Sequence, residues 1–239
     1  MPVKISLEEL LERGAHFGHQ SRRWNPKMAP YLYGINEGVH VFDLIKTKQA
    51  LEEALEFLSK AASEGKSILL VGTKKQAKQK VEDIAKALGY PYVTERWLGG
   101  ILTNFEQIKR SLSKLSEMKA KMAAGEYNKF TKKERLLIER EITRLERFFG
   151  GMAGMEKLPD LMIIIDTHKE AGAVKEAKSH GIEVVGIVDS NTDPTLVDYP
   201  IPMNDDAARA VEYVLDLIQE ALLEGKKEVK KVKPVKKVN

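Results

Sequence analysis

The chain has 239 residues, 43% of them hydrophobic and 31% charged, with a formal net charge of +4 at neutral pH. These values describe a folded soluble protein with one large or two small domains, and they exclude a disordered chain. The sequence contains no cysteine, which excludes disulfides and thiolate metal sites. No apolar run approaches the ~18 residues of a membrane span, and the N-terminus lacks the hydrophobic region of a signal peptide. We therefore expect a cytoplasmic protein without a membrane partner.

The first part of the chain predicts a short helix, a β-hairpin and then alternating helices and strands. Ser6 and Glu9 form a capping box for a helix that ends at Gly14. A loop over residues 16–30 follows, and residues 31–35 and 39–42 predict a β-hairpin. Beyond it we expect a helix over 46–63, a strand over 67–71, a helix over 76–88 and a short strand over 92–93.

The segment Arg96–Asn104, called the elbow below, combines a cation, an indole, two adjacent glycines and a terminal threonine and asparagine. It contains no nucleophile, acid–base pair or metal ligand set. We expect a rigid turn that presents Arg96 and Asn104 to a polyanion, with Trp97 and Leu98 buried as its anchor. The alternative is a tight loop held by a core tryptophan. A second segment of similar composition, His16–Met28, is called the N-terminal segment below.

Residues 105–149 predict an inserted antiparallel helical hairpin of the coiled-coil type. Two apolar stripes at spacings of three and four flank a polar turn, and a capping box at Thr131 and Glu134 starts the second helix. The stripes consist of Phe105, Ile108, Leu112, Leu115, Met118 and Met122, and of Ile138, Ile142, Leu145 and Phe149. The alternative is that both helices pack on the main core. The narrow stripes favour a protruding hairpin.

After the hairpin, the pattern returns to strands and helices. Residues 160–165 and 183–188 are continuous apolar runs, typical of strands covered on both faces. A helix over 169–180, a short edge strand over 201–203 and a last helix over 205–223 complete the pattern. Alternation of this kind predicts a doubly wound parallel sheet of the Rossmann-like α/β class, with residues 1–104 and 150–225 in one discontinuous domain. The lysine-rich residues 226–239 predict a basic, disordered tail.

Charge is segregated along the chain. The net charge is +3 over residues 1–104, +5 over 105–149, −10 over 150–225 and +6 over 226–239. One part of the molecule should therefore attract phosphate while another repels it. This pattern favours a protein docked in one orientation on nucleic acid. The acidic region 150–225 is the candidate for protein contacts.

The carboxyl ends of the predicted strands are the default ligand crevice of such a sheet. Asp166, Asp189, Asp205 and Asp206 lie there and could hold Mg²⁺ for phosphoryl transfer. Against an enzyme, neither common glycine-rich nucleotide motif is present, and each aspartate is also a natural helix cap. For His16 and His19, phosphate contact or hydrogen bonding within the loop is favoured over metal binding.

Lysines at the start of a helix are disfavoured by the helix dipole. A phosphate bound to Lys74 and Lys75 would offset that cost. The alternative is that both lysines are simply solvated.

Five parts of the sequence resemble the bacterial family of the second protein of the small ribosomal subunit, from about residue 5 to about residue 222. They are the elbow, the N-terminal segment, Val71–Gln76, Leu158–Asp166, and Val188–Pro194 followed by Asn204–Ala207. The resemblance implies a doubly wound sheet with an inserted helical hairpin. It also implies that the chain lies between the head and body of the subunit, beside other ribosomal proteins. It further implies that the large mRNA-binding ribosomal protein docks on this chain.

We therefore predict a structural constituent of the small ribosomal subunit that binds ribosomal RNA, with no catalytic role, cofactor, metal or small-molecule substrate. Basic side chains should contact phosphates, while Trp24 and Asn25 reach bases or sugars. The alternatives are a Rossmann-like nucleotide- or Mg²⁺-dependent phosphoryl-transfer enzyme and a free-standing RNA chaperone. The predicted RNA-binding residues are His16, Phe17, Gly18, His19, Arg22, Arg23, Trp24, Asn25, Lys27, Lys74, Lys75, Arg96, Trp97, Gly99, Gly100, Thr103, Asn104, Lys109 and Arg110.

Overall fold

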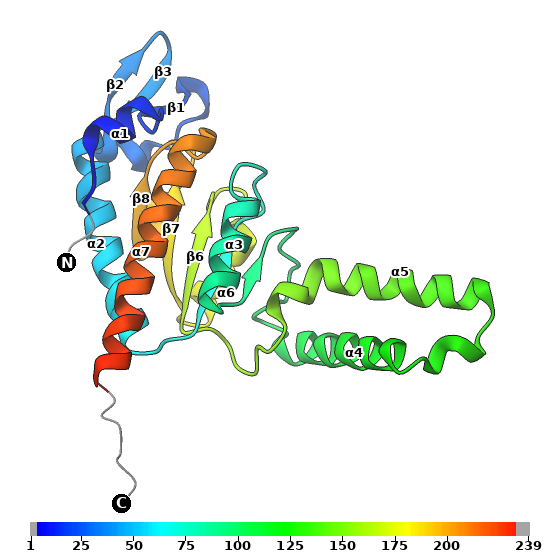
Figure 1. The fold of residues 1–239 in the computed structure, drawn as a ribbon. Helices are drawn as coiled ribbons and strands as arrows, with labels where there is room; N and C mark the ends of the chain where they lie inside the picture. Colours follow the sequence, from blue (N-terminus) through cyan, green and yellow to red (C-terminus); the bar gives the residue numbers. More distant parts are fainter. Residues whose placement is uncertain (1–3, 233–239) are drawn as a thin grey trace, which may run out of the picture.

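A computed structural model describes residues 4–232, and its centre is a five-stranded parallel sheet (Figure 1). The spatial order is β5 (Tyr92–Val93), β4 (Ile68–Val71), β6 (Leu161–Ile165), β7 (Glu183–Val188) and β8 (Tyr199–Pro202). Every neighbouring pair is parallel. All residues of β4 and β6 are buried, as expected of strands covered on both faces. The predicted α/β class with a parallel, Rossmann-like sheet is confirmed.

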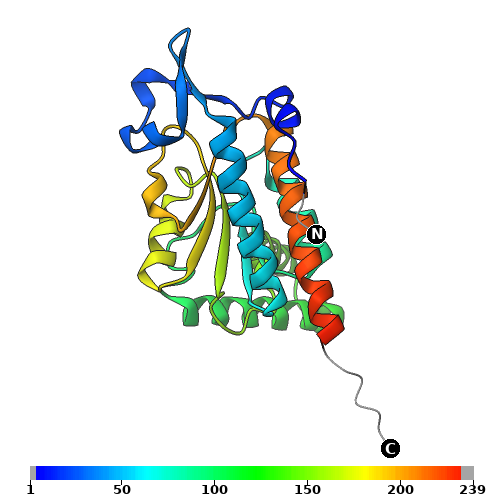
Figure 2. The ribbon, with the colours of Figure 1, turned by 90° about the vertical axis from the view of Figure 1, so that its left-hand side faces the viewer.

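Helices cover both faces of this sheet (Figure 2). On one face, α2 (Leu44–Ser63), α3 (Lys78–Leu88) and α7 (Ala208–Val232) share a core with alternate strand residues such as Leu70 and Ile163. On the other face, α6 (Ala171–Ser179) and the elbow share a second core with the intervening residues such as Val71 and Ile164. The strands therefore contribute side chains alternately to two cores, which makes the sheet the rigid base for the loops at its carboxyl edge.

A small antiparallel sheet, called the N-terminal sheet below, lies beyond the carboxyl ends of the large sheet's strands (Figure 1). Its order is β1 (Phe17–Gln20), β3 (Val39–Phe42) and β2 (Leu32–Asn36), and the short helix α1 (Leu7–Glu12) precedes it. The predicted hairpin of β2 and β3 is confirmed. The prediction of a loop over 16–30 is wrong in part, because Phe17–Gln20 pairs with β3 and two 3-10 helices, Ser21–Arg23 and Pro26–Tyr31, fill much of the remainder.

The helices α4 (Phe105–Ala123) and α5 (Lys132–Phe149) form a hairpin that projects from the α/β body (Figure 1). The capping box of Thr131 and Glu134 is present. Leu115, Ile142 and Leu145 form a separate small core between the two helices, whereas Ile108, at the base of the hairpin, belongs to the main body. Across the pair, Lys114 and Lys119 of α4 contact carboxylates of α5 at 3.1 and 2.5 Å.

The last helix, α7, is longer than predicted and runs to Val232. It passes through Gly225, which lies so close to α2 that a Cβ would collide with the carbonyl oxygen of Ser59 and with Ala62. Residues 226–232 therefore continue the helix, which corrects the predicted start of the tail, and residues 233–239 lie outside the described residues. Within residues 4–232, no helix combines the length and the apolar character needed to cross a membrane.

Candidate nucleic-acid interface

The N-terminal sheet is attached to the large sheet through His19 and the loop that follows β7. The backbone N–H of His19 donates to Ser190 Oγ at 2.7 Å, and its ring Nδ1 lies 2.8 Å from Asp189 Oδ1. The backbone N–H of Asn25 donates to the carbonyl of Ser190 at 2.7 Å. A Cβ on Gly18 would approach Ser190 Oγ to 2.9 Å, so the close contact requires glycine there. Gly18 and His19 are thus parts of an internal attachment.

The attachment has the character of a buried ion pair. Hydrogen bonding to Asp189 raises the pKa of His19 above its ordinary value, against the opposing effect of burial. Burial acts to raise the pKa of Asp189, but the bonds from His19, Ser190 and the backbone of Asp205 outweigh it and leave that pKa lowered. The His19 side chain is 18% exposed and the Asp189 side chain 1%. Among the described residues, no three histidine or carboxylate side chains are arranged to hold a metal ion.

Other predicted contacts of the N-terminal segment also have internal partners. The His16 ring packs on Phe17 with 4.0 Å between ring centroids, and burial lowers the pKa of His16. Trp24 packs on His40 at 4.6 Å between centroids. Asn25 caps the 3-10 helix by accepting from the Lys27 N–H, and Lys27 Nζ lies 2.6 Å from Asp193. Only part of this segment is free to meet a partner.

Arg22 and Arg23 are the free cations of the N-terminal segment. Both are exposed and lie on the 3-10 helix Ser21–Arg23, directly after β1. Neither forms an ion pair or a side-chain hydrogen bond with any residue in the described range 4–232. Phe17, which is 50% exposed, lies at the start of β1 and adds an exposed aromatic ring.

The elbow is held by one carboxylate, Glu176 of α6, which sequence reasoning missed. Its two oxygens accept from Trp97 Nε1 at 3.0 Å, from the backbone of Gly100, Leu102 and Thr103 at 2.8–3.1 Å, and from Thr103 Oγ1 at 3.2 Å. Burial acts to raise the pKa of Glu176, but these bonds outweigh it and leave the pKa lowered. The carboxylate thus takes the donors that a phosphate would otherwise use.

The inner and outer sides of the elbow have different roles. Trp97 is 9% exposed, which confirms its predicted place as the buried anchor, and Leu98 is half-buried. The donors of Trp97, Gly100 and Thr103 point inward to Glu176. The residues that remain exposed are Arg96, Gly99, Thr103, Asn104 and, on the first turns of α4, Arg110. Thr103 is exposed although its hydroxyl donates to Glu176. Lys109, beside them, lies 3.6 Å from Glu106 and over the ring of Phe105.

The sequence predicts that Lys74 either binds a phosphate or is solvated. In the structure it is instead paired with carboxylates of the same chain. Its ammonium group is 2.5 Å from Asp205, 2.6 Å from Asp206 and 3.4 Å from Asp166, and its side chain is 14% exposed. Burial acts to lower the pKa of Lys74, but these carboxylates outweigh it and raise the pKa above its ordinary value. Three of the four aspartates considered for Mg²⁺ therefore surround a lysine, and the fourth, Asp189, pairs with His19. Lys75 is exposed.

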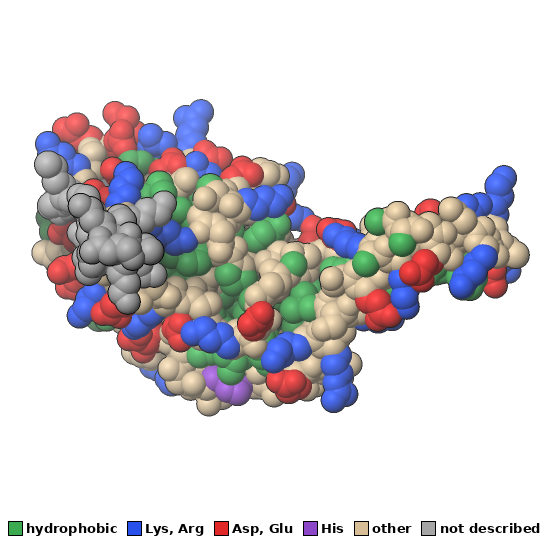
Figure 3. All heavy atoms as spheres, turned by 60° about the horizontal axis from the view of Figure 1, so that its bottom comes forward, with side chains coloured by type: hydrophobic (Ala, Val, Ile, Leu, Met, Phe, Trp, Pro, Cys, Tyr) green, Lys and Arg blue, Asp and Glu red, His purple; other side chains and the backbone are tan. Residues whose placement is uncertain are grey.

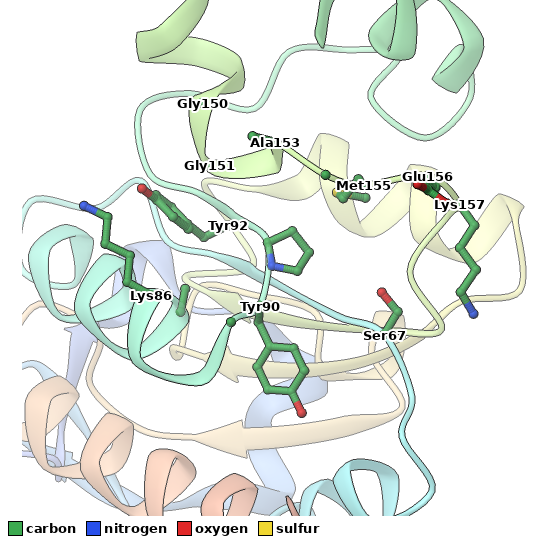
Figure 4. Close-up of a pocket in the computed structure, with 14 residues that line it drawn as sticks. Ser67, Lys86, Tyr90, Tyr92, Gly150, Gly151, Ala153, Met155, Glu156 and Lys157 are labelled. Atoms are coloured by element: carbon green, nitrogen blue, oxygen red, sulfur yellow. The ribbon is translucent and has the colours of Figure 1, made fainter. Parts of the chain in front are cut away.

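The base of the hairpin borders an open hollow of about 720 Å³ (Figure 4). Tyr90 and Tyr92 form one side of it, and the glycine-rich return from α5 forms the other. A Cβ on Gly151 would collide with Tyr92, so the close approach of these two segments requires glycine. Hydrophobic side chains are visible on this face between the body and the hairpin (Figure 3). Basic and acidic side chains alternate along the hairpin itself.

Comparison with known proteins gives one consistent result. The family model described as ribosomal protein S2 matches residues 10–225. A small ribosomal subunit protein uS2 of Brucella anthropi is 50% identical over 221 residues, which are 92% of this chain and 86% of that protein. Proteins of the same name are 48% identical in Roseiflexus sp., over 92% of this chain and 84% of the relative, and 47% identical in Chlorobaculum tepidum, over 95% and 91%. The matched region includes both the N-terminal segment and the elbow.

Proposed function

The chain belongs to the ribosomal protein S2 family, and we propose that it is a structural constituent of the small ribosomal subunit, associated with the ribosome in the cytoplasm. In this role it binds small-subunit ribosomal RNA and neighbouring ribosomal proteins and is needed for translation. It has no catalytic task. The observation that carries the proposal is the family match, which spans nearly the whole described fold.

The RNA-binding surface that we propose is narrower than the one predicted from the sequence. It consists of the exposed ring of Phe17, the half-buried Lys109 and exposed groups near the carboxyl edge of the large sheet and at the base of the hairpin: Arg22, Arg23, Lys75, Arg96, Gly99, Asn104 and Arg110. Arginine forks and lysines of this kind suit phosphate oxygens. Lys27 and Lys74 are left out because carboxylates already neutralise them. The surface is supported from beneath by His16, Gly18, His19, Trp24, Asn25, Trp97 and Gly100. Thr103 is exposed, but its backbone N–H and its hydroxyl donate to Glu176.

Protein neighbours are proposed for a different surface. Many carboxylates of the acidic region 150–225 bind groups of the same chain, including Glu176, Asp189 and Asp205. Glu212 and Glu220 of α7 are exposed and have no partner among the described residues. We propose that this outer face of α7 meets neighbouring ribosomal proteins, and that the large mRNA-binding ribosomal protein docks on this chain. We also propose that α4 and α5 pack as a coiled coil around Leu115, Ile142 and Leu145.

The experiment that tests this function is sedimentation of a lysate that contains the tagged full-length chain. We expect the protein in the small-subunit and whole-ribosome fractions of a sucrose gradient. The variant with Arg22→Ala and Arg23→Ala should shift toward the unbound fraction, while Glu56→Ala, which removes an exposed charge of α2 outside both proposed surfaces, should sediment like the wild type. A wild-type chain that stays at the top of the gradient would contradict the proposal.

A further inference from the structure

A second hollow, of about 450 Å³, lies at the carboxyl ends of β4 and β6. Its lining is Thr73, Glu95, Arg96, Trp97, Lys169, Glu170 and Gly172. The strand order is β5-β4-β6-β7-β8. The helix after β4, α3, packs on one face of the sheet, and the helix after β6, α6, packs on the other. The hollow therefore lies at the topological switch point, where the connections of two neighbouring strands diverge to opposite faces. Open α/β sheets bind their ligands at such a crevice. The volume lies within the range of small-ligand sites.

The most unusual group in this hollow is the carboxyl group of Glu170. The residue is only 3% exposed, and burial raises its pKa. Its one described side-chain hydrogen bond comes from the hydroxyl of Thr73 to Oε1. The second oxygen, Oε2, accepts no bond from the described residues 4–232. Within the described residues Oε2 is not one of the fully buried atoms left without a partner, so it is accessible and can accept from a ligand in the hollow that brings N–H groups.

Two cations stand beside this acceptor. Arg96 is exposed and has no partner within the described part of the chain, and Lys169 is exposed with its ammonium group 3.1 Å from the carbonyl of Thr73. The other carboxylate of the lining, Glu95, is paired with Lys78 and Arg147. The hollow therefore offers a hydrogen-bond acceptor beside two exposed cations, Arg96 and Lys169, and the charge of Lys169 is partly offset by Glu170. A ligand that satisfies both must carry N–H donors and an anionic group.

We propose that this hollow receives one unstacked guanine nucleotide of RNA, whose base donates to Glu170 and whose phosphate meets Arg96 and Lys169. A carboxylate repels phosphate but accepts well from the donor edge of a base. Among the RNA bases, guanine presents two adjacent N–H donors, whereas the single N–H of uracil lies between two carbonyl oxygens that a carboxylate repels. Single-stranded RNA is commonly recognised through unstacked bases in this way. The inference rests on the proposed function and adds a base-reading subsite to it.

The test uses the full-length chain labelled with ¹⁵N and titrated with 5′-GMP or 5′-UMP. We expect the amide signals of Thr73, Lys169 and Gly172 to move with GMP, at an affinity about tenfold higher than with UMP. Glu170→Gln keeps the size of the side chain and its bond from Thr73 but replaces an acceptor oxygen by a donor, so it should abolish the preference. Arg96→Ala should weaken both nucleotides alike. Glu56→Gln, at an exposed position of α2 on the opposite face of the sheet from the elbow, is the matched control.

A second arm separates an RNA nucleotide from a free one. A single-stranded pentamer of uridines with a central guanosine should bind at least about tenfold more tightly than GMP, because Arg96 and Lys169 would then meet neighbouring phosphates as well. Equal affinity for pentamer and GMP would indicate a free mononucleotide and overturn the RNA assignment. Equal affinity for GMP and UMP, or a preference that survives Glu170→Gln, would overturn the base-reading role. Neither result alters sedimentation of the wild-type chain with the small subunit, so the proposed function is tested separately.

Discussion

The N-terminal sheet and the elbow are both held by carboxylates of the acidic region 150–225, but through different kinds of donor. His19 contributes an ionisable ring to Asp189 and a backbone amide to Ser190. Glu176, in contrast, gathers three backbone amides of the elbow together with the side chains of Trp97 and Thr103. The first attachment depends on a pair of titratable side chains, His19 and Asp189. The second depends mainly on backbone geometry, which Gly100 permits with its φ of +97°.

This difference explains what the acidic region does. Its net charge of −10 does not face outward as a whole, because several of its carboxylates bind donors or cations of the first half of the chain. Those internal contacts hold two basic segments in place and leave Arg22, Arg23 and Arg96 exposed. The charge that is segregated along the sequence thus partly organises the molecule, and the arginines that stay exposed belong to the RNA-binding surface that we propose.

The largest expected effect is the loss of the elbow's anchor. Trp97→Ala should lower the free energy of unfolding by about 3–5 kcal/mol, because it leaves a cavity in the second core and removes a donor from Glu176. Trp97→Phe fills most of the volume and should cost clearly less. Arg96→Ala, next to it but exposed, should change stability by less than about 0.5 kcal/mol. Urea unfolding followed by circular dichroism measures all three, and equal losses for Arg96 and Trp97 variants would contradict the inner and outer assignment.

Removing the acceptor should have the next largest effect. Glu176→Ala leaves the indole N–H and three amides of the elbow without their partner, so we expect a loss of about 2–4 kcal/mol in the free energy of unfolding. Amide hydrogen exchange at Gly100, Leu102 and Thr103 should accelerate, while exchange in β6 and β7 stays slow. Glu212→Ala provides the matched exposed control. Unchanged protection at these three amides would show that the elbow is held by packing alone.

The attachment of the N-terminal sheet should depend on pH. The pKa of His19 is raised on folding, so its stabilising contribution is complete below the unfolded histidine value of about 6.5 and is lost as pH rises through the folded value. The pKa of Asp189 is lowered, so its contribution is present above the unfolded aspartate value of about 3.9 and is lost as pH falls through the folded value.

Both contributions are therefore present between about pH 4 and pH 6.5. The stability difference between wild type and His19→Ala should be about 1–3 kcal/mol near pH 6 and should decrease toward pH 9. Chemical denaturation at several pH values measures this difference. His180→Ala, which removes an exposed histidine, is the control for general effects of pH. A difference that stays constant from pH 6 to pH 9 would argue against an ionic His19–Asp189 pair.

The smallest effect on stability, and a selective effect on binding, is expected for Arg22→Ala with Arg23→Ala. Both side chains are exposed and unpaired within the described residues, so the melting temperature should be unchanged within error. If both contact phosphate, the log–log slope of RNA affinity against salt should become shallower by about 1.8. Filter binding to small-subunit ribosomal RNA at several salt concentrations gives this slope. An unaltered slope would remove these arginines from the proposed surface.

Much of the fold could be predicted from the sequence because most helices and strands leave a local pattern of apolar residues. The buried strands β4 and β6 read as continuous apolar runs, and the stripes of α4 and α5 repeat every three or four residues. Strand β1 was missed because Phe17–Gln20 is short, mostly polar and without a buried residue, so neither apolar run nor alternation is visible. The extension of α7 was missed because glycine usually ends a helix, whereas Gly225 marks close contact with α2.

The supporting parts of the site were harder to predict, because they depend on contacts between distant parts of the chain. Glu176 lies 73–79 residues from its donors, and a glutamate within a helix gives no local sign of such a role. His19 and Asp189 are 170 residues apart, and Lys74 and Asp205 are 131 apart. The buried position of Trp97 could be predicted because a large apolar ring in a glycine-containing turn needs cover. The excess of acidic residues in one region was the only hint that basic segments have internal partners.

Glu176 holds the elbow from the inside through five donors, and we propose that the outer side of the elbow binds RNA. The most direct test is competition between tagged wild-type and Glu176→Gln chains for incorporation into small subunits, at a temperature where both are folded. Glu176→Gln changes no exposed basic group but replaces one acceptor oxygen of the elbow by a donor. We predict that the variant is under-represented in purified subunits by about tenfold, the equivalent of about 1.4 kcal/mol. Equal incorporation, with the amides of Gly100 and Thr103 shown to exchange rapidly, would contradict the account.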